Sequence, residues 1–224
     1  MDFLKRTKLL IGDSGIEKLN KANIILFGCG GVGGYTAEML VRSGIVNITI
    51  VDFDVVDVTN INRQIIALNT TVGKNKVDVL KQRLLDINPN ANVTAICERY
   101  TENSNILNTG YDYVIDAIDS VADKLALIKQ SHNLGLNIIS AMGAGNRCDI
   151  PEFKVVDISK TFNDGLAKII RKKLRDAGIE KHKVVFTSNP RVEHEGNDIG
   201  SIAYYPAMCG CVLSAYVINE IVGV

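Results

Sequence analysis

Residues 23–33 read NIILFGCGGVG, and this stretch indicates how the chain folds. An apolar run at 23–27 is followed directly by the pattern G-x-G-x-x-G, formed by Gly28, Gly30 and Gly33, and then by a helical pattern that ends at residue 43. Glycines let the backbone turn tightly and approach a phosphate, and the N-terminus of a helix favours its negative charge. We therefore predict a strand, a phosphate-binding turn and a helix; glycines that only permit close helix–strand packing are the alternative explanation.

The alternation of strands and helices continues on both sides of this turn. An apolar run at 48–51 ends in Asp52, and strands that are covered on both faces, as in parallel sheets, are continuously apolar in this way. Further strands are predicted at 93–97, 113–116, 137–140, 153–157 and 183–186, and helices at 14–20, 31–43, 73–87, 103–107, 121–134, 164–177 and from Pro206 onward. This order predicts an α/β fold, an open, doubly wound and mainly parallel Rossmann-like sheet with a C-terminal extension.

The composition is that of a globular protein without a dominant charge. Of 224 residues, 46% are hydrophobic, and 25 Lys and Arg balance 25 Asp and Glu, which excludes disorder and the long-range field of a general polyanion binder. The N-terminal residues lack the pattern of a signal peptide, and polar residues interrupt the apolar run at 207–224, so we expect a cytoplasmic protein with no membrane partner. Five cysteines without regular spacing predict reduced thiols.

Charged and polar motifs follow the predicted strand ends, where open α/β sheets bind ligands. The glycine turn with Asp52, a carboxylate suited to ribose hydroxyls, would by itself fit an NAD-dependent oxidoreductase. Three further motifs follow in order, Asn60-x-x-Arg63-Gln64, Val72-Gly73-x-x-Lys76 and Asp116-x-x-Asp119. Their basic side chains would converge on the phosphates of a nucleotide, whereas the alternative for each charge taken alone is an ordinary exposed ion pair.

These four motifs, in this order, resemble the superfamily of ubiquitin-activating enzymes and their bacterial ThiF-like relatives, which adenylate sulfur-carrier proteins, over residues 6–140. The resemblance implies a site for ATP, with Mg²⁺ held by Asp119 and catalytic roles for Arg63, Lys76 and Asp119. It also implies a homodimer in which Arg6 reaches the ATP of the other copy. The other nucleotide contacts that it implies are Gly28, Gly30, Gly31, Gly33, Asp52, Asp54, Asn60, Gln64 and Ser120.

The chain beyond residue 140 resembles one branch of relatives, the tRNA threonylcarbamoyladenosine dehydratases. The resemblance rests on DAIDS at 116–120, SAMGAGN at 140–146, DISKT at 157–161 and Asp164-x-x-Ala167-Lys168. It implies that ATP activates the threonyl carboxylate of a modified tRNA nucleoside, and that the carbamoyl group of the same nucleoside closes a ring with net loss of water. It further implies a single adenylating domain over 1–224, with an ATP-binding core at 1–140 and a substrate-side extension at 141–224.

A basic segment within this extension suits a tRNA substrate. Lys and Arg outnumber Asp and Glu between residues 164 and 183, and such cations make salt-sensitive contacts with phosphates. The expected tRNA contacts are Lys168, Arg171, Lys172, Lys173 and Arg175. A solvated helix face with routine ion pairs is the alternative explanation.

Other activities stay open on the sequence. The main alternative is adenylation of the C-terminal glycine of a ubiquitin-like sulfur-carrier protein, although the chain lacks the C-x-x-C pairs that bind zinc in such enzymes; a non-catalytic binding protein is another. Cys209-x-Cys211 is either a metal or persulfide site or two small buried thiols, since residues two apart do not share a helix face. The three histidines lack metal-ligand spacing, and we predict His132, His182 and His194 at the surface. Any sulfur-transfer or redox partner stays unidentified.

Overall fold

A computed structural model of the chain describes residues 3–196 and 198–224. Its strands are β1 (Asn23–Phe27), β2 (Asn47–Val51), β3 (Asn92–Ile96), β4 (Tyr113–Asp116), β5 (Ile138–Ala141), β6 (Phe153–Asp157) and β7 (Lys183–Thr187). Its α-helices are α1 (Lys5–Lys21), α2 (Gly33–Ser43), α3 (Lys76–Ile87), α4 (Val121–Asn133), α5 (Gly165–Asp176) and α6 (Tyr204–Val222).

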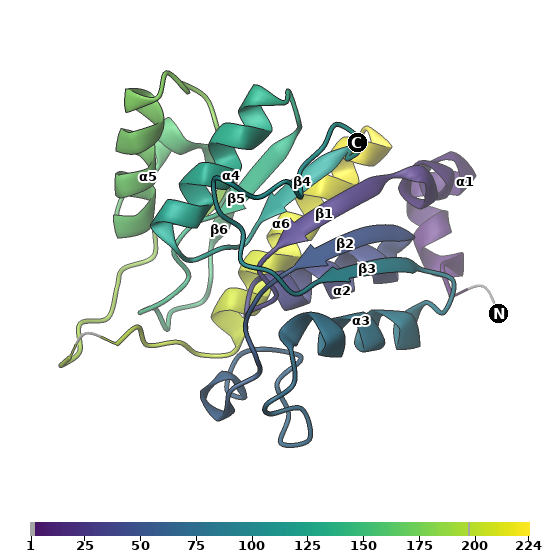
Figure 1. Cartoon of the computed structure of the whole chain (residues 1–224), viewed down its shortest axis with the longest axis horizontal. Coiled ribbons are helices and arrows are strands. Elements are labelled where there is room, and N and C mark those ends of the chain that lie inside the picture. Colours follow the sequence, from purple (N-terminus) through teal and green to yellow (C-terminus); the bar gives the residue numbers. More distant parts are fainter. Residues whose placement is uncertain (1–2, 197) are drawn as a thin grey trace.

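The strands form one sheet in the order β3-β2-β1-β4-β5-β7-β6 (Figure 1). Every neighbouring pair is parallel except β6 and β7, which run antiparallel at the edge. The direction of the strand order reverses between β1 and β4, which creates a crevice at their carboxyl ends. The predicted α/β class and the mainly parallel, doubly wound sheet are confirmed.

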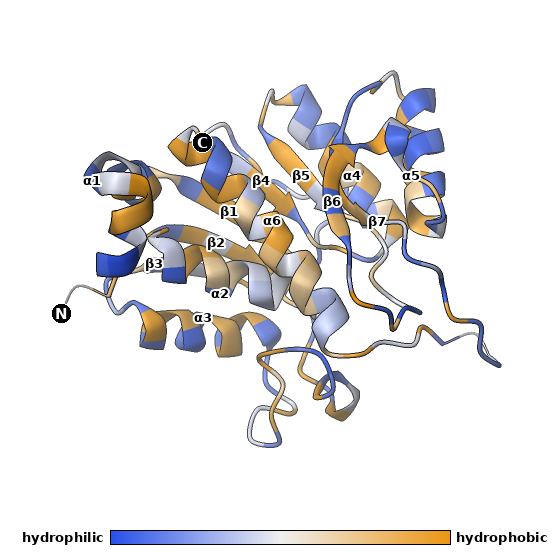
Figure 2. Ribbon diagram, turned by 180° about the vertical axis from the view of Figure 1, so that it is seen from behind, coloured by the Kyte–Doolittle hydropathy of each residue, from blue (hydrophilic) through white to orange (hydrophobic). Residues whose placement is uncertain are grey.

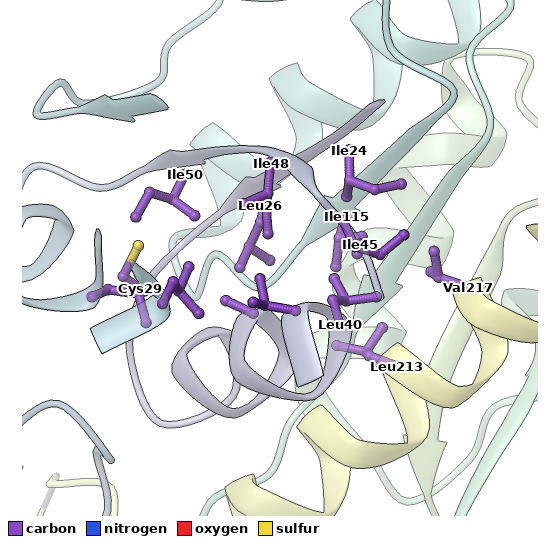
Figure 3. Close-up of a cluster of buried hydrophobic side chains, with 14 of the residues drawn as sticks. Ile24, Leu26, Cys29, Leu40, Ile45, Ile48, Ile50, Ile115, Leu213 and Val217 are labelled. Atoms are coloured by element: carbon purple, nitrogen blue, oxygen red, sulfur yellow. The ribbon is translucent and has the colours of Figure 1, made fainter. Parts of the chain in front are cut away.

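Helices cover both faces of the sheet, as the continuously apolar strands predicted. Along β1, Ile24 and Leu26 pack into a core with α2, α3 and α6, whereas Ile25 and Phe27 pack into a second core with α4 and α5. Figure 3 shows the first core, with Leu40 of α2 and Leu213 of α6 meeting the strand side chains. Because each fully buried aliphatic side chain contributes about 1.5–3 kcal/mol, these two layers hold the strand ends in place.

The C-terminal part of the chain extends this sheet. Strand β7 pairs with β5 in parallel, and β6 pairs with β7, so residues 153–187 continue the same layer. Helix α6 then returns across the sheet to pack against α2, as Figure 1 shows in yellow. In Figure 2 the strands are largely orange and α5 is largely blue, which matches the buried sheet and the basic character of α5.

Several element boundaries differ from the sequence-based predictions. The short helix predicted at 103–107 is wrong: this segment is irregular, and the hydroxyl of Ser104 accepts a hydrogen bond from the backbone N–H of Thr101. Side chains that bond the nearby backbone in this way compete with helix formation. The first helix is longer than predicted, because α1 continues through a kink at Gly12, whose φ is +69°.

Helix α6 is long and apolar enough to cross a membrane by length and composition, with a mean hydropathy of 1.3 in its most apolar window. In this fold its residues Cys209, Gly210, Leu213 and Val217 are buried against α2 and the sheet. Pro206 lies in the first turn of α6. Backbone N–H groups there have no partner within the helix, so the missing N–H of proline costs no hydrogen bond. The packing of α6 is that of a core helix.

Candidate functional site

A cavity of about 590 Å³ opens at the carboxyl ends of the parallel strands. This is the edge at which doubly wound sheets bind ligands. The residues predicted from the sequence that line it are Gly28, Gly30, Gly31, Asp52, Asp54, Arg63, Gln64, Lys76 and Asp119. The predicted residues that do not line it are Gly33, Asn60, Ser120, Arg6 and the five cations of α5.

The glycine turn connects β1 to α2. Some of its glycines permit close packing, and one exposes its backbone to the cavity. Gly28 has φ +92°, and a Cβ there would lie 2.6 Å from the carbonyl oxygen of Ala117. A Cβ on Gly33 would lie 1.7 Å from the carbonyl oxygen of Gly28, so both glycines are required for close packing. Gly30 instead faces the open cavity, where a Cβ would meet only the Gln64 amide at 3.7 Å. The turn therefore combines the packing role and the exposed backbone that a phosphate site needs.

Asp52 ties the end of β2 to the glycine turn. Its Oδ2 accepts a hydrogen bond from the N–H of Cys29 at 2.6 Å, and its Oδ1 accepts one from the N–H of Asp54 at 2.8 Å. Burial raises the pKa of this carboxyl above its ordinary value, while the two backbone hydrogen bonds and Lys76 act in the opposite direction. Each oxygen has a second lone pair, so the carboxylate can also accept hydrogen bonds from ligand hydroxyls.

Lys76 begins helix α3 and points into the cavity from a nearly buried position. Its side chain is 8% exposed, and its Nζ lies 2.7 Å from Oδ2 of Asp54. The backbone N–H of Lys76 also donates to the carbonyl of Asp54 at 2.9 Å, which holds the two residues together. The cation therefore has a fixed position next to the glycine turn and the N-terminus of a helix, both of which favour an anion.

The Asn60-x-x-Arg63-Gln64 motif divides into a supporting residue and two cavity residues. Asn60 is buried and accepts a hydrogen bond from the N–H of Asp57 through its side chain, closing a short 3₁₀ turn at Val58–Asn60. Arg63 is held by the carbonyl of Thr59 at 2.8 Å. Gln64 is 7% exposed, and its Oε1 has no hydrogen-bond partner among the described residues. A buried amide oxygen without a partner beside the glycine turn is a position that a ligand donor would satisfy.

The motif Asp116-x-x-Asp119 also divides into a buried and an exposed carboxylate. Asp119 lines the cavity and makes no hydrogen bond or ion pair with the described part of the chain. Ser120 caps α4 by accepting a hydrogen bond from the N–H of Asp123. Asp116 is fully buried and pairs with Lys124 of α4. Asp119 is therefore the carboxylate of this motif that is free to meet a ligand.

The chain is similar to known proteins over nearly its whole length. The ThiF family model matches residues 4–224. The chain belongs to the ThiF family. A tRNA threonylcarbamoyladenosine dehydratase of Bacillus subtilis is 40% identical to it over 236 residues, covering 96% of this chain and 93% of that relative.

Solved structures extend the comparison to three dimensions. This ThiF-family chain resembles the E. coli tRNA N6-threonylcarbamoyladenosine dehydratase TcdA in complex with AMP, with a TM-score of 0.93, 35% identity, and coverage of 97% of this chain and 93% of that one. The complex of TcdA with ATP gives a TM-score of 0.90 at 34% identity, with the same coverage of both chains. The family resemblance predicted from the sequence motifs is therefore confirmed.

Two predicted contributions of the ThiF-family chain lie away from the cavity. Arg6 is exposed on α1, and Figure 1 shows this helix at the end of the sheet where β1 begins. The cavity is lined by residues at the opposite ends of the strands. On α5, Lys168, Lys172, Lys173 and Arg175 are exposed. Arg171 differs, because its guanidinium donates hydrogen bonds to the carbonyl and the hydroxyl of Thr161 at 2.7 and 2.6 Å.

The structure of the ThiF-family chain corrects one histidine prediction and describes the C-x-C pair. His182 is not at the surface: it is 3% exposed, and its Nε2 lies 2.8 Å from Oγ of Ser140, because β7 places it inside the sheet layer. His132 and His194 are exposed as predicted.

The two thiols of the C-x-C pair differ in burial. Cys209 is fully buried, and burial raises the pKa of its thiol to about 12, whereas Cys211 is half-buried. Within residues 3–196 and 198–224, no three His, Cys, Asp or Glu side chains gather as metal ligands.

The sequence motifs missed several charged residues of the cavity wall. Arg99 pairs with Asp123 and lies 5.4 Å from the ring centre of Phe53, and all three line the cavity. Arg99 lies two residues beyond the strand predicted at 93–97, so its position just after a strand end was a signal that could have found it. Arg147 and Arg191 line the opposite wall, which is built by residues beyond β5. No spacing in the sequence connects these two arginines.

Proposed function

We propose that this ThiF-family chain is an ATP-dependent tRNA threonylcarbamoyladenosine dehydratase, which activates a carboxylate of its substrate as an acyl adenylate. The observation that carries the proposal is the TM-score of 0.93 to a dehydratase in complex with AMP, at 35% identity over 97% of the chain. The cavity supports the same function, since the exposed glycine backbone, Asp52, Arg63 and Lys76 meet at the strand ends.

The first step is attack of the threonyl carboxylate on ATP. A carboxylate oxygen forms a bond to the α-phosphorus, the bond from that phosphorus to the oxygen bridging to the β-phosphate breaks, and pyrophosphate leaves with the electron pair. Such a step depends on positioning and on neutralising phosphate charge. Arg63 and Lys76 supply positive charge on one side of the cavity. By analogy with a single oxyanion donor, losing one such group costs on the order of 3 kcal/mol in the transition state.

The residues of the cavity fit a bound Mg²⁺. This ion is usually held in proteins by one or two carboxylates together with water and substrate phosphates, so a complete cage of side chains is not required. Asp119 is exposed to the cavity with no partner of its own among the described residues, and it is the residue that would hold the ion. When bound there, Mg²⁺ supplies positive charge to the phosphates and the leaving pyrophosphate.

The second step closes a ring within the substrate. The carbamoyl group attacks the activated carbonyl carbon, the bond to the AMP oxygen breaks, AMP leaves with that electron pair, and the carbamoyl group loses a proton. The sum of both steps removes one water from the nucleoside. Because both reacting groups belong to the same nucleoside, the reaction requires no nucleophilic side chain of the protein. The buried thiol of Cys209, with its raised pKa, suits packing and not nucleophilic attack.

Further parts of the proposal concern partners and organisation. The exposed cations of α5, Lys168, Lys172, Lys173 and Arg175, together with Arg171, are assigned to tRNA phosphates. We assign the chain to a cytoplasmic homodimer by its family resemblance, and in this dimer Arg6, which does not line the cavity of its own chain, would reach the ATP of the other copy. Residues 1–140 then act as the ATP-binding core of a single domain, and residues 141–224 as its substrate-side extension.

The test is incubation of the purified chain with ATP, Mg²⁺ and tRNA bearing threonylcarbamoyladenosine, followed by mass spectrometry of the nucleosides. We expect an ATP-dependent mass loss equal to one water. Pyrophosphate release that occurs only with a ubiquitin-like carrier protein would instead assign the chain to carrier adenylation. NAD binding with indifference to ATP would assign it to the oxidoreductases.

A matched pair of aspartate variants tests the role of Asp119. Asp119→Ala is expected to abolish AMP formation while the fold stays intact, as judged by circular dichroism. The control is Asp86→Ala, an exposed aspartate near the end of α3 that lies far from Lys76 at its beginning. Turnover by Asp119→Ala equal to that of Asp86→Ala would remove Asp119 from the mechanism.

A further inference from the structure

The cavity has a second half that the nucleotide residues do not form. The residues that line this half are 141–145 and 147 at the end of β5, 164–166 and 169 at the start of α5, and 191, 199 and 201 between β7 and α6. Met142, Leu166, Ile169 and Ile199 make part of this wall apolar. Two cations, Arg147 and Arg191, line the same half.

Arg147 is a buried cation held by neutral groups. It is 4% exposed, its Nε donates to the carbonyl of Asn189 at 3.0 Å, and its Nη1 donates to the carbonyl of Gly143 at 2.8 Å. Its Nη2 donates to the carbonyl of Asn163 at 3.1 Å. The guanidinium therefore joins residues 143, 163 and 189, and none of its hydrogen-bond partners among the described residues carries a negative charge.

Arg191 lies on the segment that connects β7 to α6 and lines this half of the cavity. The segment is fixed to Asn146, whose carbonyl accepts a hydrogen bond from the N–H of Val192 at 2.7 Å and whose Oδ1 accepts one from the N–H of Gly200 at 2.5 Å. A Cβ on Gly165 would lie 3.6 Å from Nη1 of Arg191, which places this guanidinium at the N-terminus of α5. Arg191 makes no hydrogen bond or ion pair within the described part of the chain.

The two arginines act on each other electrostatically. Burial lowers the pKa of Arg147, the positive charge of Arg191 lowers it further, and Asp164 acts in the opposite direction. The carboxylate of Asp164 is occupied by backbone donors, because it accepts hydrogen bonds from the N–H of Gly143 at 2.9 Å and from the N–H of Ala167 at 3.0 Å. This half of the cavity therefore carries a net positive charge, and two neighbouring cations are relieved by an anion that enters between them.

We propose that Arg191 binds the carboxylate of the acceptor nucleoside in this half of the cavity, and that Arg147 positions the loops that present it. The inference rests on the proposed function and names the acceptor site of that reaction. A guanidinium fork matches the two oxygens of a carboxylate, and a purine nucleoside suits the apolar part of the wall. One source of the anion is the threonyl carboxylate; the other source with the same chemistry is a phosphate of the RNA backbone, and the experiment separates them.

The decisive measurement is binding of the free nucleoside N6-threonylcarbamoyladenosine and of its methyl ester by calorimetry, with no turnover required. The ester keeps the shape and removes the negative charge. We expect the wild-type chain to prefer the acid at least about tenfold, which is the scale of a hydrogen bond to a charged group. Arg191→Gln should abolish this preference, and Arg191→Lys should restore part of it. The control is Glu193→Gln, an exposed residue of the same segment, which should keep the preference.

Steady-state kinetics with modified tRNA separate binding from positioning. Arg191→Gln should raise KM for modified tRNA while leaving KM for ATP and the affinity for unmodified tRNA unchanged. Arg147→Gln should raise KM for modified tRNA and also lower kcat, because the loops that Arg147 joins are then no longer held in place. Arg147→Lys should recover part of kcat.

Equal binding of acid and ester by the wild-type chain would overturn the inference. The inference would also be overturned if Arg191→Gln lost as much affinity for unmodified tRNA as for modified tRNA, since the contact would then be to a phosphate. A wild-type chain that shows the Arg191-dependent preference for the acid but no ATP-dependent dehydration would retain the inference and refute the proposed function.

Discussion

The Nζ of Lys124 lies 2.8 Å from Oδ2 of Asp116, and both side chains are fully buried. The same ammonium donates to the carbonyl of Ala141 at 3.0 Å, and Oδ1 of Asp116 accepts a hydrogen bond from the N–H of Ile118. The pair therefore joins the ends of β4 and β5 beneath the cavity. Through Ile118 it also sets the backbone that leads to Asp119.

We predict that Lys124→Met lowers the free energy of unfolding by about 3–5 kcal/mol, because it leaves the buried carboxylate of Asp116 without a counter-charge. The double variant Lys124→Met with Asp116→Leu should recover most of this loss, since no buried charge is then left alone. Urea unfolding measures both effects. Lys129→Met, at an exposed position of the same helix, should change stability by less than about 0.5 kcal/mol. Equal effects of the two single substitutions would refute the role of the pair.

Lys76 is expected to act on the phosphates and not on stability. Lys76→Ala should lower kcat for AMP formation about a hundredfold or more, on the order of 3 kcal/mol, because a preorganised positive charge is lost. Its partner Asp54 is 48% exposed and can be solvated in the variant, so unfolding should change little. Lys74→Ala, at an exposed position just before α3, serves as the control. Similar rates for the two variants would exclude a role for Lys76 in the reaction.

The basic face of α5 is expected to bind tRNA through phosphates. Lys172→Gln should weaken binding of modified and unmodified tRNA alike, and the slope of log Kd against log salt concentration should shrink by about one. Fluorescence anisotropy over a salt series measures both. Lys21→Gln, on α1, should leave affinity and slope unchanged. An unchanged slope in Lys172→Gln would favour the alternative of a solvated helix face.

His182 is expected to make the fold sensitive to acid. Burial, together with charge repulsion from His132 and Lys124 of α4, lowers its pKa to about 3, and Asp157 of β6 acts in the opposite direction. Between pH 3 and 6.5 the unfolded chain therefore binds a proton that the folded chain does not, so stability falls as pH falls through this range. At pH 5 the loss due to this group is about 2 kcal/mol.

The corresponding experiment compares urea unfolding at pH 7.5 and pH 5. His182→Gln should lose less stability between these two pH values than the wild-type chain, by about 2 kcal/mol, because it cannot gain the proton on unfolding. His194→Gln, at an exposed position, should follow the wild-type chain. Parallel pH dependences of wild type and His182→Gln would show that another group is responsible.

The motif residues that reached the cavity share one property, their place in the chain. Gly30, Asp52, Lys76 and Asp119 follow strands or begin helices, and parallel strands end at one edge of the sheet, so position along the chain predicts position in space. Asn60 belongs to the same motif as Arg63 but supports the loop from within. Motif spacing does not distinguish a ligand contact from a residue that holds the loop.

The residues that the sequence analysis missed depend on partners far away in the chain. Arg147 is buried because carbonyls of residues 143, 163 and 189 surround it, and these meet only after β5, β6 and β7 have paired. His182 looks like a surface histidine until β7 places it against Ser140. The segment 103–107 is the local exception, because the hydroxyl of Ser104 accepts a hydrogen bond from the nearby backbone N–H of Thr101 and competes with helix formation.

Apolar periodicity and turn chemistry are local properties, and they were sufficient for the α/β class and the glycine turn. The family of this chain was indicated by a resemblance in four ordered motifs, which are also local in the sequence. Long-range packing was required for the second wall of the cavity, for the Lys124–Asp116 pair and for the burial of His182. The reason is that burial and charge pairing are set by which distant segments come into contact, and desolvation changes what a side chain does by several kcal/mol. No residue carries that information in its own sequence neighbourhood.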